Sequence, residues 1–259
     1  MSIHLYFPLP HLAVLQVSRP GVRNALNWQA IQDFRDHIDQ IAALPDLRAC
    51  ILTGTGSAFI SGGDLKELSE YPSRADGLRL SRLMSEALLR LENLPCPTIA
   101  AINGPARGGG AEISLACDLR VMAEDADLGF VQVNLGLTPG WGAGQRLLRL
   151  VGYSLALEWL ATGRILTASQ AGEYHLANQI VPSGVALDAS IELASEIASK
   201  PPEAVRAMKR LLQVGLQLPP ASAAWLEQEE FPALWAGAAH LNAVQRFLES
   251  RQTETENNS

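Results

Sequence analysis

Two glycine-rich turns hold the residues of this chain whose types and spacing could do chemistry. The first is Ala58–Glu67 (AFISGGDLKE) and the second is Asn103–Glu112 (NGPARGGGAE). In each, a predicted strand runs into glycines and then into a helix, and glycine lets the main chain approach a ligand because it has no Cβ. The first N–H groups of a helix lack internal partners and carry the positive end of its dipole. Two such turns facing each other would offer two donors to one oxyanion.

Glu112 is the candidate proton-transfer group beside these glycines. It stands at the start of the helix that is predicted to follow the triple glycine. A carboxylate there can also serve only to complement the helix dipole, but its place beside two candidate oxyanion donors favours a role in catalysis. The sequence contains no GxGxxG, GxxxxGK[ST] or GxSxG pattern. A Rossmann site, a P-loop or a nucleophilic serine therefore lacks its signature.

The two turns belong to a run of alternating strands and helices. Apolar runs predict strands at Leu12–Ser18, Ala49–Thr53, Pro97–Asn103 and Leu119–Ala123. Apolar residues at helical spacing predict helices over Trp28–Ala43 (capped by Asn27), Ser73–Leu94 and Ala111–Ala116. From about Gly140 onward the pattern is almost wholly helical, with Thr167 as an N-cap and a helix opening at Pro201. This order predicts an α/β core over residues 1–195 and a helical region over residues 196–259.

Composition narrows the class of protein further. Of 259 residues, 47% are hydrophobic and 18% are charged, which is enough apolar material for a folded core. The formal net charge of −7 argues against a general nucleic-acid binder, although a local basic patch could still meet an anionic ligand. No apolar run reaches the roughly 18–20 residues of a membrane span, so we expect no membrane association.

The cysteine and histidine patterns bear on metals and on the cellular compartment. The three cysteines have no CxxC spacing, and the five histidines show no ligand spacing, so we predict no metal site and no disulfide framework. The chain starts MSIHLYFPLP, without the basic and apolar segments of a signal peptide. We therefore expect a cytoplasmic protein in a reducing setting.

Several motifs, in order, resemble the enoyl-CoA hydratase/isomerase (crotonase) superfamily. AFISGGDLKEL resembles its first oxyanion-hole motif, INGPARGGGAEISLACDLRVMAEDADLGF its second, and LGLTPGWGAGQRLLRLVG and LTASQAGEYHLANQIVP the stretches that follow. The match runs from about Leu12 to Val181 and more loosely beyond. The resemblance implies a crotonase (ClpP-like) spiral of ββα units over residues 1–195. It also implies a helical C-terminal trimerisation region over residues 196–259, giving a homotrimer or a homohexamer built as a dimer of trimers.

The resemblance also implies roles for individual residues. The N–H groups of Gly63 and Gly109 would hold the oxygen of an acyl-CoA thioester. Trp141 would roof the acyl pocket, although a buried tryptophan can equally be plain core. Arg107 stands where the family usually has a small or apolar residue; we expect it to be solvated or paired with a surface acid. The residues implied to border the CoA part are Arg23, Asn24, Ala25, Leu26, Ser61, Asp64, Leu65, Lys66 and Gly108.

The reaction depends on the two positions where hydratases of this superfamily carry glutamates. The first is Glu112, but the second, four residues before Gly136, is Gln132. Glutamine cannot exchange a proton near neutral pH. FVQVNLGLTPGWGAGQRL resembles the alkylmalonyl-CoA (ethylmalonyl- and methylmalonyl-CoA) decarboxylases, which also lack the second glutamate. We therefore favour decarboxylation, with Glu112 as proton donor and with Gln132 or a water orienting the substrate carboxylate.

Two alternatives stay open. One is an enoyl-CoA hydratase or isomerase that uses Glu112 alone or with a second acid, such as Glu124 or Asp127. The other is a catalytically inactive CoA-binding subunit, against which the intact set of Gly63, Gly109 and Glu112 argues. No separate cofactor is implied in any of these, because CoA is part of the substrate.

Overall fold

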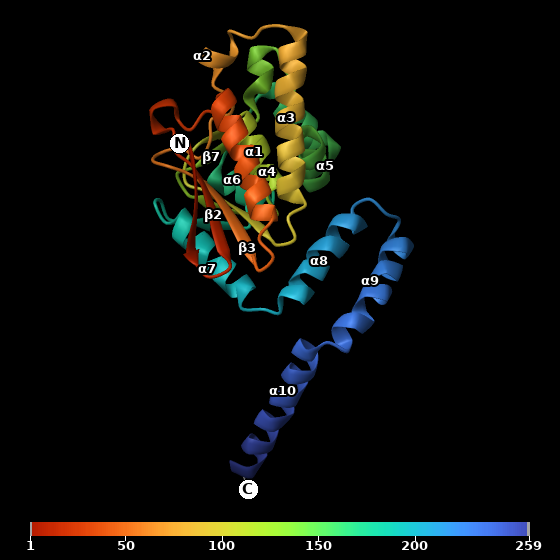
Figure 1. Cartoon of the computed structure of the whole chain (residues 1–259). Coiled ribbons are helices and arrows are strands. Elements are labelled where there is room, and N and C mark those ends of the chain that lie inside the picture. The colour runs from red at the N-terminus through yellow and green to blue at the C-terminus, as the bar shows by residue number, and fades with distance from the viewer. Residues whose placement is uncertain (1, 258–259) are drawn as a thin grey trace. The chain divides into compact units, whose positions relative to one another are not determined.

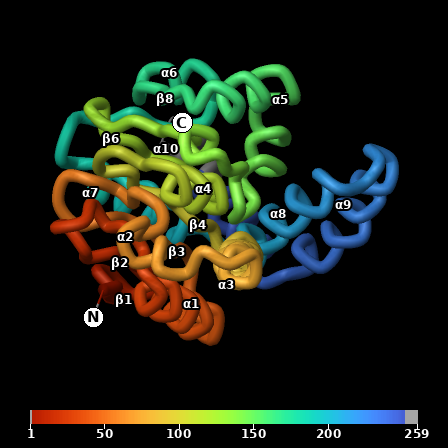
Figure 2. Tube along the Cα trace, turned by 90° about the horizontal axis from the view of Figure 1, so that it is seen from above, coloured from red at the N-terminus to blue at the C-terminus, as the bar shows by residue number. Residues whose placement is uncertain are grey.

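The four apolar runs predicted as strands lie side by side in one six-stranded sheet. The computed structural model describes residues 2–257, and side chains for residues 2–250. The strands in this range are β1 (Ile3–Leu9), β2 (Leu12–Val17), β3 (Ala49–Gly54), β4 (Thr98–Ile102), β5 (Ala106–Arg107), β6 (Leu119–Ala123), β7 (Asp127–Gly129), β8 (Ile165–Thr167) and β9 (Gln179–Val181). The order in the large sheet is β1-β2-β3-β4-β6-β9, seen from above in Figure 2. β1 pairs antiparallel with β2, and the other neighbours are parallel.

Helices cover both faces of this sheet. The first unit of the chain, residues 1–198, contains the short helices η1 (Pro20–Val22) and η2 (Val131–Leu135) and the helices α1 (Trp28–Ala42), α2 (Leu65–Leu68), α3 (Arg74–Glu92), α4 (Gly109–Ala116), α5 (Ala143–Thr162), α6 (Ala168–Glu173) and α7 (Ala186–Ala198). Leu12 and Val14 pack toward α7, whereas Ala13 and Leu15 pack toward α1 and α3, which lie side by side in Figure 1. Burial on both faces explains why these strands read as unbroken apolar runs.

The second glycine-rich turn is part of a ββα unit that contributes to two sheets. β4 lies in the large sheet, and β5 pairs with β7 in a three-stranded sheet of order β5-β7-β8. α4 follows β5 directly and begins at Gly109. The first N–H groups of α4 therefore lie next to the first glycine-rich turn, to which Arg107 is hydrogen-bonded.

The predicted caps are confirmed, and the chain after Gly140 is mostly helical, but the sequence missed two short strands there and placed the start of α4 two residues late. Asn27 caps α1 by accepting from the Ala30 N–H, and Thr167 forms a capping box with Gln170. However, β8 and β9 both lie after Gly140. Each is three residues long, too short for an alternating pattern to show. β1, with Pro8 near its end, occupies an edge of the sheet and was not predicted either.

The second unit, residues 199–259, is helical in the part that the structure describes, as expected for the C-terminal region. It contains α8 (Pro202–Gly215), α9 (Pro220–Trp235) and α10 (Ala238–Asn257). Large apolar side chains on these helices are exposed, including Leu212, Phe231 and Trp235. Assembly through this region stays a prediction. Among the helices within residues 2–257, none is both long and apolar enough to cross a membrane.

Asn24 ties the loop after β2 to the first glycine-rich turn. Its side chain is fully buried. Its Nδ2 donates to the carbonyl oxygens of Thr55, Ala58 and Phe59 at 2.9, 2.8 and 3.1 Å, and its Oδ1 accepts from the Arg19 N–H. One side chain thus satisfies backbone groups of both segments. The buried Asn24 amide therefore has a structural role, which does not depend on the predicted contact of its loop with CoA.

Replacing Asn24 with alanine is expected to lower the free energy of unfolding by roughly 2–4 kcal/mol, because buried carbonyl groups lose their donor. Urea unfolding followed by circular dichroism measures this. Asn134→Ala, at an exposed position, is the matched control and should change stability by less than about 0.5 kcal/mol. Equal stability of the two variants would contradict the structural role of Asn24.

Candidate functional site

The two glycine-rich turns lie against each other. The Phe59 N–H donates to the Pro105 carbonyl, and the Arg107 N–H donates to the Ile60 carbonyl at 3.1 Å. The loop of residues 23–26 joins them from the other side, because the Leu26 N–H donates to the Gly62 carbonyl at 2.7 Å. The structure therefore brings together three segments that the sequence predicted to share one site.

Glycine is required at this junction because the backbones approach so closely. A Cβ on Gly62, whose φ is +92°, would lie 2.9 Å from the Gly109 nitrogen. A Cβ on Gly110 would lie 1.7 Å from the Ile60 carbonyl oxygen. Among the residues that the structure describes, the N–H groups of Gly63 and Gly109 have no acceptor within the chain. Both are free to donate to a ligand at this junction.

Glu112 is buried in the interior, with 2% of its surface exposed. Its Oε2 accepts from the N–H groups of Trp141 and Ala143 at 2.7 and 3.0 Å. Its Oε1 accepts from the Gly140 N–H at 3.3 Å and from Gln132 Nε2 at 2.9 Å. Burial raises the pKa of Glu112, and these four donors oppose that rise because they favour the charged form. A carboxyl group with a raised pKa suits proton transfer near neutral pH.

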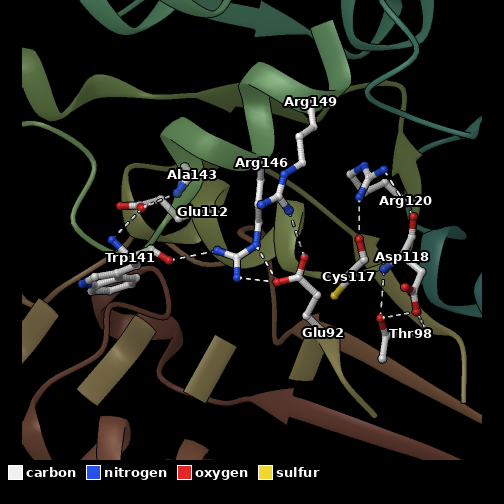
Figure 3. A network of polar contacts seen from close by, with 10 residues as sticks. All are labelled: Glu92, Thr98, Glu112, Cys117, Asp118, Arg120, Trp141, Ala143, Arg146 and Arg149. Carbon is white, nitrogen blue, oxygen red and sulfur yellow. Dashed lines mark hydrogen bonds and ion pairs between the residues drawn. The ribbon is translucent and has the colours of Figure 1, made fainter. Parts of the chain in front are cut away.

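Three of the four donors to Glu112 are backbone N–H groups at the turn before α5. The sequence predicted Trp141 of this turn as a wall of the acyl pocket but did not reveal these N–H groups as partners of Glu112. Gly142 has φ +97°, in the left-handed region, and caps α5. Successive N–H groups around such a residue can converge on one anion. Figure 3 shows Glu112 beside Trp141, with Arg146 on the far side of the turn. The signal was available in PGWGAG, where glycines flank Trp141 immediately before a helix.

Gln132 contacts Glu112 directly from η2. Its Nε2 donates a hydrogen bond to Glu112, while its Oε1 is buried and has no partner among the described residues. Buried polar atoms in folded proteins normally have a hydrogen-bond partner. A water or a donor group of a ligand is therefore expected at Oε1.

Trp141 lies on the turn before α5 and packs on the second glycine-rich turn. Its side chain is 6% exposed. A Cβ built on Gly109 would be 2.1 Å from the indole ring, so the ring rests directly on the glycine whose N–H is a predicted oxyanion donor. The side chain is buried, as a core residue would be, and it also forms an apolar wall of the candidate site.

Arg107 and the two alternative acids are bonded to groups other than Glu112. Arg107 forms a two-pronged ion pair with Asp127, in agreement with the predicted pairing to an acid. Its pKa is lowered by burial and by the neighbouring Arg23. Glu124 is exposed and accepts from the Ser183 N–H. Neither Asp127 nor Glu124 is bonded to Glu112.

The residues predicted to border CoA divide into buried and exposed groups. Ala25 and Leu26 are buried with Asn24, while Arg23, Leu65 and Lys66 are exposed. Ser61, Gly108 and Asp64 are partly buried, and Asp64 pairs with Arg19 at 3.1 Å. The exposed members lie on the loop and helix that flank the first turn. Contact with CoA stays a prediction for all of them.

Comparison with known proteins identifies the family. Residues 10–258 match the family described as enoyl-CoA hydratase/isomerase. The chain belongs to this family.

Members of this family resemble the chain over nearly its whole length. The short-chain-enoyl-CoA hydratase of Clostridium acetobutylicum is 34% identical, with 94% of this chain and 93% of the relative covered. The ethylmalonyl-CoA decarboxylase of Gallus gallus is 29% identical, covering 95% of this chain and 83% of the relative. A crystal structure of an enoyl-CoA hydratase from Bacillus anthracis has a TM-score of 0.92 at 35% identity, covering 96% and 97% of the two chains. The predicted crotonase fold is confirmed.

Replacing Gly109 with alanine is expected to displace the Trp141 ring and disturb the donor beneath it. Loss of one oxyanion donor typically lowers kcat by about 10²–10³-fold, and we expect a loss of that order, with a shift in tryptophan fluorescence. Gly144→Ala is the matched control, because a Cβ there meets no atom within 4 Å. Full activity of the Gly109 variant would contradict the prediction that the Trp141 ring and the donor beneath it cannot accommodate a methyl group.

Proposed function

We propose that this crotonase-superfamily enzyme binds an acyl-CoA thioester and decarboxylates a 2-carboxyacyl-CoA such as ethylmalonyl- or methylmalonyl-CoA. The observation that carries the proposal is the pair at the site: one buried carboxyl group, Glu112, bonded to an amide, Gln132. A reaction that needs one proton donor fits this pair better than one that needs two acids. The likeness to an ethylmalonyl-CoA decarboxylase over 95% of the chain supports it.

The proposed decarboxylation needs only one proton donor. The bond between Cα and the substrate carboxylate breaks, CO2 leaves, and the electron pair becomes an enolate on the thioester. The N–H groups of Gly63 and Gly109 donate to the enolate oxygen. Glu112 donates its proton to Cα and then regains one from solvent. Because the acid form is required, the rate should fall as pH rises through the pKa of Glu112, which burial places above its usual value.

Two features of the site support loss of CO2 over addition of water. Trp141 forms an apolar wall next to the oxyanion donors, and an apolar surface favours a step in which a carboxylate becomes neutral CO2. Gln132 can turn its amide, so that Oε1 accepts the proton of neutral Glu112 while Nε2 faces the substrate carboxylate. The amide can thus serve the acid form of Glu112 as well as the charged form.

Hydration of an enoyl-CoA is the second candidate. The unpartnered Oε1 of Gln132 could accept from a water that Glu112 activates. Relatives such as the short-chain-enoyl-CoA hydratase of Clostridium acetobutylicum support this possibility at 34% identity. It requires Glu112 to act as both base and acid, since no other carboxylate is bonded to Glu112 among the described residues.

The test is to incubate the protein separately with ethylmalonyl-, methylmalonyl- and crotonyl-CoA and to weigh the products. We expect loss of CO2 from an alkylmalonyl-CoA, and a loss of at least about 10²-fold in Glu112→Gln. Glu124→Gln, which removes an exposed carboxylate, should leave turnover unchanged. Hydration of crotonyl-CoA without any CO2 release would overturn the proposed reaction in favour of the second candidate.

A Gln132→Glu variant is expected to redirect the chemistry. It would place a second carboxyl group against Glu112, and two neighbouring carboxyl groups share protons with separated pKa values. We expect decarboxylation to fall, because the substrate carboxylate meets a new negative charge, and crotonyl-CoA hydration to rise. Gln132→Met, which has no charge, separates loss of the amide from gain of the acid. Unchanged decarboxylation in both variants would remove Gln132 from the mechanism.

A further inference from the structure

The turn that donates N–H groups to Glu112 also has carbonyl groups, and side chains of α3 donate hydrogen bonds to one of them. Ser81 and Ser85 both donate their hydroxyl groups to the Gly140 carbonyl, at 2.7 and 3.2 Å. They are four residues apart on one helix and therefore share a face. The Gly140 carbonyl belongs to the same peptide group as the Trp141 N–H, so this peptide group points its carbonyl at α3 and its N–H at Glu112.

Arg146 holds the next carbonyl of the same turn. Its Nη1 donates to the Trp141 carbonyl at 3.0 Å, and its Nη2 and Nε donate to Glu92 at the end of α3, at 2.8 and 3.3 Å. Glu92 lies seven residues after Ser85, close to the same face of the helix. Figure 3 shows this chain of contacts from Glu112 through Trp141 and Arg146 to Glu92.

We propose that Ser81, Ser85 and Arg146 are positioning residues of the catalytic site. Ser81 and Ser85 hold the peptide group whose N–H, that of Trp141, donates to Glu112. Arg146 holds the next peptide group and thereby fixes the turn between the Trp141 and Ala143 N–H groups. The inference rests on the proposed function only in taking Glu112 as the acid. It places the control of that acid on α3 and α5, two helices outside both glycine-rich turns.

The charged groups around Glu112 are already paired with one another. α4 packs against α5, α3 and β5. These elements bring Arg146 and Arg149, which both pair with Glu92, and Arg107, which pairs with Asp127. η2 supplies Gln132 and no charged residue. The serines are therefore expected to act on Glu112 through the hydrogen bonds that its carboxyl group accepts from the turn.

The inference predicts the direction in which Glu112 titrates when the serines are removed. In Ser81→Ala/Ser85→Ala the turn loses two donors to its Gly140 carbonyl, and its N–H groups hold Glu112 less well. Weaker bonds to the charged form raise the pKa of a carboxyl group. We expect an upward shift of about one pH unit, the size of one weakened hydrogen bond to a charged group.

The shift is measured by infrared titration of the full-length protein without substrate. The Glu112 carboxyl band is the one that disappears in Glu112→Gln. Ser81→Thr/Ser85→Thr retains both hydroxyl groups and should titrate like the unsubstituted protein. Ser195→Ala is the control, since its hydroxyl donates only to Ile191 of its own helix, α7. Because no reaction is involved, the result stands apart from whether the enzyme decarboxylates or hydrates.

A titration curve of the double alanine variant that superimposes on the unsubstituted protein's would overturn the inference. So would a threonine variant that shifts as far as the alanine variant. The single Ser81→Ala variant, which loses the shorter contact, should shift less in the same direction. With an active substrate, the pH–rate profile should move in parallel, with kcat more affected than KM.

Discussion

A carboxyl group in an apolar interior needs hydrogen-bond donors in place of water, and this requirement shapes the candidate site. Glu112 meets it with three backbone N–H groups of the turn before α5 and with the amide of Gln132. The backbone donors are available because the turn opens a helix. The same turn carries Trp141 onto Gly109, so the acid, the apolar wall and one oxyanion donor have a common support. A change in the turn would therefore affect all three.

The rest of the first unit brings the two glycine-rich turns to this support. Parallel strands end at the same edge of a sheet, and the segments that follow β3 and β4 meet there. Close approach is possible only without side chains, as the 1.7 Å between a Cβ on Gly110 and the Ile60 carbonyl oxygen demonstrates. Buried links such as Asn24 then hold the loops together. The fold places the donors, and glycine lets them come within reach of one ligand atom.

Much of this arrangement could be predicted from the sequence. Apolar runs and cap residues predicted the central strands and the main helices, because these features act locally. The glycine-rich turns and Glu112 were recognisable from residue types and order. Contacts between segments far apart in the sequence could not be predicted. Nothing local in Ser81, Ser85 or Glu92 indicates that they hold a turn nearly 60 residues later. The same limit hid the partners of Arg107 and the three-residue strands β8 and β9, which are defined by pairing and not by pattern.

The central claim is that two backbone N–H groups, from Gly63 and Gly109, bind the oxygen of an acyl-CoA thioester. Infrared difference spectroscopy of bound butyryl-CoA, ¹³C-labelled at the thioester carbonyl, tests it most directly. Donors at the oxygen weaken the C=O bond, so the labelled band should move to lower frequency on binding, and the shift should shrink in Gly109→Ala. A band at the frequency of free butyryl-CoA, with the ligand shown to be bound, would contradict the account.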